Sequence, residues 1–238
     1  MKAFKFNGVD FSRWLSATPV GVPVSHSLSV TASEVPGRPG AVPTFAQTGA
    51  KEMRFFARLR VPWCGWRQVQ ELQRRISTAL YAPEGAELVS PRNPSLRYKD
   101  VYLTDPGEWD GLWASGSAEV GFTAYDPIAY GVRRKIADAS NEFDVMGTWE
   151  TRPVVTARPK AGGYWQAYCN GAVFRLQREF DGTEVIVVDS EKALVTVDGA
   201  SAMTDLTTGS DFPVFKPGKN VFQVEGGSVS AEWDERWL

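Results

Sequence analysis

Two short stretches of the sequence each gather three carboxylates, and these are the first residues that could do chemistry. The members are Asp105, Glu108 and Asp110 in one stretch, and Glu232, Asp234 and Glu235 in the other. A glycoside hydrolase needs two carboxyl groups about 5–10 Å apart, one as acid and one as base or nucleophile. Acids beside tryptophan are also common on ordinary surfaces, and the sequence identifies no environment that would perturb their pKa values. A small glycan hydrolase, with an acid such as Glu108 or Glu235, stays open as an alternative.

Other residue types that support catalysis are scarce in this chain. His26 is the single histidine, although histidine is the commonest side chain for proton transfer near neutral pH. Cys64 and Cys169 lie far apart and match no metal-binding or CxxC spacing, so we expect two free thiols. The sequence contains no nucleophile elbow, Walker motif, HExxH or EF-hand loop, and the glycines of 114–121 precede a strand rather than a helix. We therefore expect no enzyme activity, no cofactor and no metal.

The composition is that of an ordinary globular protein in which charge is unevenly distributed. The 238 residues are 43% hydrophobic and 23% charged, and no apolar run approaches the roughly 18–20 residues of a membrane helix. The start of the chain lacks the apolar core of a signal peptide, so we expect folding in a cytoplasm. Residues 1–135 carry a net charge of +5 and residues 136–238 one of −7, which predicts two units. The basic residues are too dispersed for nucleic-acid readout.

The elements that would position these residues begin with β structure. Asn7-Gly8 separates two short apolar runs, which is a strong hairpin signal. A strand is predicted over 54–61, with Phe55, Ala57 and Leu59 on one face. Its other face carries Arg54, Phe56, Arg58 and Arg60. Because this second face is cationic and amphipathic, we expect it to be solvated or to face a partner.

One helix is predicted in the first unit, over 66–81. Its apolar residues recur at helical spacing, and they are Val69, Leu72, Ile76 and Leu80. Further strands are expected within 19–32 and at 86–90, 96–103 and 116–125. Residues 34–52 contain three prolines and three glycines without periodicity, which predicts a long loop or extended arm. The hairpin tip expected at 105–113 carries Trp109 and Trp113, either as a small satellite core or as a contact surface.

The second unit, 136–238, is predicted to be an antiparallel β-sandwich. Its expected strands are 151–158, 164–169, 171–177, 183–189, 192–197, 220–225 and 227–233. The stretch GFTAYDPIAYG, 121–131, marks the boundary, since Asp126-Pro127 should turn the chain out of the last strand. Tyr164, Trp165 and Tyr168, with Trp149 nearby, could form a platform that stacks on sugars. Alternatively, Trp165 and other alternate residues face the core, because a strand sends every second side chain inward.

The assembled pattern resembles the distal tail protein family of long-tailed siphophages. The residues that carry the resemblance are FNGVDFSRWLS, RFFARLRVPWCGWRQVQELQRRISTALY, GFTAYDPIAYG and LTTGSDFPVFKPGKNVFQVEG. The resemblance implies a mainly β fold, with an N-terminal ring-forming β-sandwich that has one helix and a hairpin, 1–135. It also implies a C-terminal galectin-like β-sandwich, 136–238. Six copies would form a homohexameric ring, possibly two stacked rings, that joins the tail tube protein to the tail-tip fibre protein.

The resemblance therefore predicts a structural virion protein at the tail tip, assembled in the host cytoplasm, with no catalytic residues. Ring contacts would come from the arm 34–52, the strand 54–61 and the hairpin tip 105–113. The side chains expected at the ring interface are Arg54, Arg58, Arg60, Trp109 and Trp113. The second unit has no inserted loop that could hold an additional sugar-binding module. The alternative of a carbohydrate-binding β-sandwich module requires Trp165 or Trp149 to be exposed.

Overall fold

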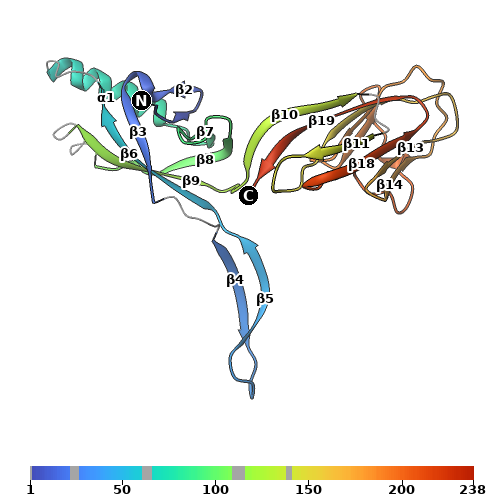
Figure 1. Cartoon of the computed structure of the whole chain (residues 1–238), viewed down its shortest axis with the longest axis horizontal. Helices are drawn as coiled ribbons and strands as arrows, with labels where there is room; N and C mark the ends of the chain where they lie inside the picture. The colour runs from blue at the N-terminus through green and yellow to red at the C-terminus, as the bar shows by residue number, and fades with distance from the viewer. Residues whose placement is uncertain (1, 22–26, 61–65, 109–115, 138–140) are drawn as a thin grey trace. The chain divides into compact units, whose positions relative to one another are not determined.

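The computed structural model describes residues 2–21, 27–60, 66–108, 116–137 and 141–238. The chain divides into two compact units, Met1–Ala129 together with Leu238, and Tyr130–Trp237. Both units consist mainly of antiparallel strands (Figure 1), so the predicted mainly β fold is confirmed. The boundary expected at 135/136 falls inside strand β10 (Ala129–Ala137).

One antiparallel sheet builds the N-terminal unit. Its strands are β1 (Lys5–Phe6), β2 (Val9–Asp10), β3 (Leu15–Val20), β6 (Lys51–Leu59), β7 (Ala86–Val89), β8 (Arg97–Asp105) and β9 (Ser117–Ala124). They pair in the order β2-β1-β7-β8-β9-β6-β3. A short 3₁₀ helix, Phe11–Arg13, connects β2 to β3. The backbone N–H of Ala17 donates to the carbonyl of Lys2 at 3.2 Å, which joins β3 to the segment preceding β1.

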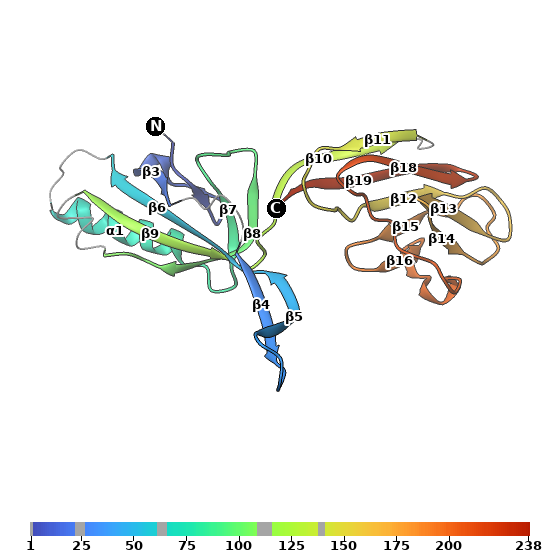
Figure 2. The same ribbon diagram turned by 60° about the horizontal axis from the view of Figure 1, so that its bottom comes forward.

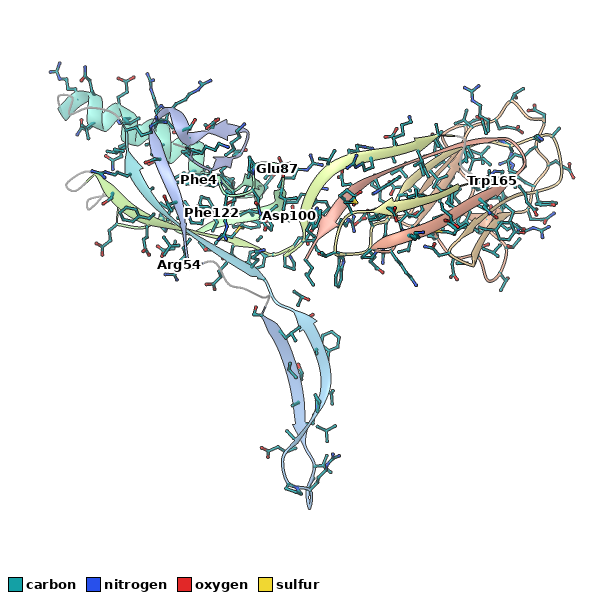
Figure 3. All side chains as sticks on the ribbon, in the orientation of Figure 1. Phe4, Arg54, Glu87, Asp100, Phe122 and Trp165 are labelled. Carbon is teal, nitrogen blue, oxygen red and sulfur yellow. The ribbon has the colours of Figure 1, made fainter. Side chains whose placement is uncertain are left out.

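Phenylalanine side chains form the centre of the N-terminal core. Phe4 packs on Phe55 and on Phe122, with both pairs of ring centroids 5.2 Å apart (Figure 3). Each of these rings is at most 1% exposed, and full burial of such a side chain stabilises the fold by about 1.5–3 kcal/mol. Helix α1 (Trp66–Leu80) adds the buried side chains of Ile76 and Leu80. The predicted helix and its apolar stripe are confirmed.

The predicted first hairpin is confirmed by its backbone angles. Asn7 and Gly8 have φ values of +50° and +73°, and they connect β1 to β2. Two successive residues with positive φ are the requirement of a type I′ turn, whose twist matches that of the paired strands. Glycine and asparagine tolerate this conformation better than other residues.

A second hairpin forms most of the segment 34–52, which was expected to be a long loop or an extended arm. Strand β4 (Leu28–Glu34) pairs with β5 (Ala41–Thr48), and β6 then begins at Lys51. The pairing shifts register between Thr31, opposite Phe45, and Ala32, opposite Pro43. Such a bulge accommodates Pro43, which has no N–H to donate to a ladder. Of the two alternatives for this segment, the extended arm agrees with the structure and the loop does not, because a proline at a bulge does not end a strand.

Two sheets form the C-terminal unit, and Figure 2 labels most of their strands. One has the order β17-β16-β15-β12-β19-β10 and the other β11-β18-β13-β14. The strands not yet defined are β11 (Asn141–Val145), β12 (Val154–Arg158), β13 (Trp165–Cys169), β14 (Ala172–Leu176), β15 (Ile186–Asp189), β16 (Leu194–Val197), β17 (Ala200–Ser201), β18 (Gly218–Glu225) and β19 (Ser228–Trp237). Side chains from both sheets enter one core, which includes Trp165, Phe222 and Trp233. The predicted sandwich is confirmed.

The chain enters the C-terminal unit through a strand that the sequence pattern does not indicate. Strand β9 ends at Ala124, and Asp126 Oδ1 accepts the N–H of Ile128 at 3.0 Å to form the predicted turn. Strand β10 then begins at once, and β11 follows, although no strand was expected between 125 and 151. The exposed run Val132–Lys135 hides the strand from sequence reasoning, because it shows no alternation of buried and exposed residues.

A glycine in the β18–β19 turn gives a test of this packing. A Cβ on Gly227 would lie 1.9 Å from the carbonyl oxygen of Arg158, whereas one on Gly209 would meet nothing within 4 Å. Both glycines have positive φ, +87° and +86°, so alanine strains the backbone at both. We expect Gly227→Ala to lower the free energy of unfolding by about 1–3 kcal/mol more than Gly209→Ala. Urea denaturation of both variants measures this, and equal losses would contradict the packing.

Candidate functional site

The outward face of strand β6 combines two arginines with an aromatic ring. Arg54, Phe56 and Arg58 are exposed, whereas Phe55 and Ala57 between them are buried. The predicted alternation along this strand is confirmed. Phe56 is 43% exposed although it lies in the middle of the sheet, between β3 and β9. This sheet face offers a partner an aromatic contact with a guanidinium on either side.

The five residues expected at a ring interface have different surroundings. Arg54 and Arg58 are free to reach a partner from the exposed face, and Arg54 is labelled in Figure 3. Arg60 is less available, because its Nη1 donates to the carbonyl of Ser12 at 3.0 Å. Trp109 and Trp113 lie outside the described residues.

A cavity with more basic than acidic lining residues lies beside Arg54, and no pattern in the sequence indicates it. It has a volume of about 290 Å³ and includes Arg54, Lys51 and Arg92 among its lining residues. Lys51 Nζ donates to the hydroxyl of Tyr98 at 3.0 Å and lies 4.8 Å from the centroid of that ring. The loop before β8 brings Arg92 to β6, and the start of β8 brings Tyr98 there. These long-range contacts leave no local pattern in the sequence.

The hairpin of β4 and β5 is the most exposed element among the described residues. Its apolar side chains include Leu28, Val30 and Phe45, which are 68%, 53% and 58% exposed. Within the described part of the chain each of its two strands pairs only with the other, so each has one free edge. Free strand edges and exposed apolar side chains both favour association with another chain.

The clustered carboxylates hold turns and strands in place. Glu232 accepts from Lys135 Nζ at 2.9 Å, and this hydrogen bond, with the charges of Lys135 and Arg133, lowers the pKa of Glu232. Glu235 is buried and accepts the N–H of Gly147 at 2.8 Å. In the other cluster, Asp105 Oδ1 accepts the N–H of Gly107 at 3.0 Å, Glu108 is exposed, and Asp110 lies outside the described residues. These contacts give Asp105, Glu232 and Glu235 structural roles.

The proposed aromatic platform does not form as a sugar-stacking surface with Trp165. Trp165 is 1% exposed and belongs to the core (Figure 3), so the inward alternative is the correct one. Tyr164 is exposed, but the guanidinium carbon of Arg175 lies 4.3 Å from its ring centroid. The hydroxyls of Tyr164 and Tyr168 both donate to Glu225, at 3.3 and 3.2 Å. The two tyrosines therefore already have partners within the unit.

The remaining candidates do not come together in a metal-binding group within the described residues. His26 and Cys64 lie outside those residues. Cys169 is buried, and Trp149 is 37% exposed. Over the described ranges, no group of three or more His, Cys, Asp or Glu could hold a metal ion. The same ranges contain no helix that is long and apolar enough to cross a membrane.

Comparison with known proteins identifies the class of fold. Residues 146–237 match the family model described as "Siphovirus-type tail component, C-terminal domain". Over 99% of both chains, the protein resembles the Dit protein of phage SPP1, described as a paradigm of the hub adsorption apparatus in phages that infect Gram-positive bacteria, with 16% identity and a TM-score of 0.78. A chain of the phage p2 baseplate in its activated conformation matches over 98% of both chains, with 8% identity and a TM-score of 0.48. No curated protein matches.

The whole chain therefore has the fold of a siphophage tail hub protein. Within its C-terminal unit, residues 146–237 are similar to the C-terminal domain of siphovirus-type tail components. The resemblance to the distal tail protein family is confirmed, by the family match for this unit and by the SPP1 Dit structure for the fold of the complete chain.

The buried cysteine gives a pH-dependent prediction. Burial raises the pKa of the Cys169 thiol to about 11 from an ordinary value of 9.0. The unfolded state therefore loses this proton first, and folding should weaken by roughly 2 kcal/mol as pH rises from 9 through 11. We expect the difference in unfolding free energy between the wild type and Cys169→Ser to shrink over this range, as measured by urea denaturation. A difference independent of pH would contradict the assigned burial.

Proposed function

We propose that this chain is a structural protein of the phage tail tip, a distal tail hub whose N-terminal unit assembles into a homohexameric ring. Single rings or two stacked rings would join the tail tube protein to the tail-tip fibre or baseplate proteins, at the tip of the virion. The ring would assemble in the host cytoplasm. No catalytic step, cofactor or metal is part of this function.

The observation that carries the proposal is the exposed β4–β5 hairpin in a chain with the fold of the SPP1 Dit hub protein. A hairpin that leaves Leu28, Val30 and Phe45 in water is poorly suited to a monomer. A contact between the hairpin of one copy and a different surface of the next is heterologous. Such contacts repeat from copy to copy and close into a ring when the rotation fits.

The outward face of β6 is proposed as a second part of the ring interface. Arginine and aromatic side chains dominate the energetics of protein interfaces, and this face presents Arg54, Phe56 and Arg58 together. Residues 1–135 carry a net charge of +5 and residues 136–238 one of −7. Because opposite charges favour the correct orientation of partners, this difference supports ordered contacts between copies or between stacked rings.

The first test of the ring is removal of the hairpin. The N–H of Gly49 donates to the carbonyl of Ser27 at 2.9 Å, so the two ends of the hairpin are close together. Replacing Leu28–Thr48 by two glycines should leave both cores intact and abolish the ring. Light scattering should then give a monomer of about 24 kDa, because the 26.2 kDa chain loses 19 residues, in place of a ring of about 157 kDa for six wild-type copies. Rings that persist in a folded variant would contradict the role of the hairpin.

The second test reverses the charges of the β6 face. Arg54→Glu combined with Arg58→Glu should raise the protein concentration needed for ring formation at least about tenfold, as expected for interface arginines. Both side chains are exposed, so the thermal midpoint of the monomer should change little. The matched control, with the same change in net charge, is Arg152→Glu combined with Arg158→Glu, at two exposed arginines of the C-terminal unit. An equal effect of the control would show that net charge, rather than this face, is responsible.

A further inference from the structure

The N-terminal unit contains an apolar groove at the end of helix α1. Its volume is about 330 Å³. The larger lining side chains are Leu80, Tyr81, Pro83, Tyr102, Leu103 and Pro106. Tyr81 is 73% exposed, and Tyr125, which is 64% exposed, packs edge-on against Tyr102 with 5.5 Å between the ring centroids. The groove thus has two tyrosines and two prolines in its lining, and a third tyrosine, Tyr125, packs against one of them.

Acidic residues occur in the two chain segments that line most of this groove, and we call them its acidic rim. The two segments that line most of it, 81–85 and 102–108, contain Glu84, Asp105 and Glu108 and neither lysine nor arginine. All three carboxylates are exposed. A partner that fits the groove should therefore combine small apolar groups with a positive charge.

The tip of the β4–β5 hairpin has this combination. Its sequence from 35 to 40 is Val-Pro-Gly-Arg-Pro-Gly, and every one of these residues is exposed. The N–H of Arg38 donates to the carbonyl of Val35 at 3.1 Å, which makes the tip a tight turn. Arg38 is the single basic residue between 28 and 48, and its guanidinium has no acidic partner in the described part of the chain. The tip thus carries two proline rings with one arginine between them.

The length of the hairpin favours a contact with another copy. Strand β4 has seven residues, which at roughly 3.3 Å per residue place the tip about 23 Å from the hairpin's base. An arm of this length reaches well beyond its own sheet, and its side chains are exposed over this distance. Tip and groove are different surfaces of the same chain, so their contact is heterologous, as ring closure requires.

We propose that the hairpin tip of one copy docks into the Tyr81–Tyr102 groove of the next copy. Pro36 and Pro39 would pack on the tyrosine rings, and Arg38 would pair with the acidic rim. Tyrosine and arginine are typical of the residues that supply most of the binding energy at interfaces. The assignment rests on the proposed ring function and names the surface that receives the arm.

Charge exchange tests the pairing of Arg38 with the rim. Arg38→Glu should raise the concentration for ring formation at least about tenfold, and Glu84→Arg should weaken the ring in the same direction. The double variant should recover most of the lost affinity in light scattering. Tyr81→Ala should also weaken the ring, whereas Tyr81→Phe, which keeps the aromatic ring, should not. Arg158→Glu alone is the matched control.

Disulfide trapping tests the contact directly. We would combine Arg38→Cys with Glu84→Cys in a chain whose Cys64 is replaced by serine, since Cys169 is buried and does not compete. Mild oxidation should link different copies into a ladder of covalent multimers up to the closed ring, and either single variant should give none. Absence of the ladder from a preparation that forms rings would overturn the inference.

The outcomes separate this inference from the proposed function. If Arg38→Glu and Tyr81→Ala leave the ring intact while removal of the hairpin abolishes it, the groove assignment is wrong and the ring function stands. The arm would then bind another surface of its neighbour. If the wild type forms no ring at any concentration, the proposed function fails and the groove assignment fails with it.

Discussion

Packing of Phe4 between Phe55 and Phe122 is the contact on which the N-terminal unit depends. These three rings come from the start of the chain, from β6 and from β9, so their contact fixes the sheet across its long-range pairings. Phe55 also sets the side-chain alternation of β6. Because it points inward, Arg54 and Phe56 must point outward. The same contact that stabilises the core therefore orients the candidate assembly surface.

The exposed β4–β5 hairpin is a separate two-stranded sheet, and its outer strand edges differ from those of the main N-terminal sheet. Strands β6 and β9 pair with another strand along both edges, and β3 pairs with β6 and hydrogen-bonds to the segment before β1. By contrast, β4 and β5 each leave one edge without a strand among the described residues. A soluble monomer usually protects such edges with charge, yet this hairpin carries only Glu34 and Arg38. The nearly uncharged shaft and charged tip are the features expected of a segment that another copy covers, as the proposed ring requires.

Much of the fold could be predicted from local pattern. The helical spacing of Ile76 and Leu80, the alternation along β6 and the Asn7-Gly8 turn all follow from short-range rules, and the structure has each of them. Strand β10 could not be recognised, because its exposed charges are paired across strands: Arg133 and Lys135 contact Glu232. Strand β5 was hidden by Pro43, since the bulge that accommodates the proline depends on its partner strand.

The candidate site was predictable only in part, because some of its contacts depend on tertiary structure. The exposure of Arg54 and Arg58 follows from the period of one strand, whereas the hydrogen bond that ties Arg60 to Ser12 depends on tertiary structure. The groove joins Tyr81 to Tyr102 across residues that are distant in sequence. Contacts between copies involve a second chain, and the pattern of a single sequence does not show which surfaces meet.

The absolute mass of the wild-type protein in solution tests the central claim most directly. Multi-angle light scattering over a concentration series should show a species of about 157 kDa, six times the 26.2 kDa chain, or twice that mass for two stacked rings. A strict monomer across the whole series would contradict the account of this chain as a ring-forming hub.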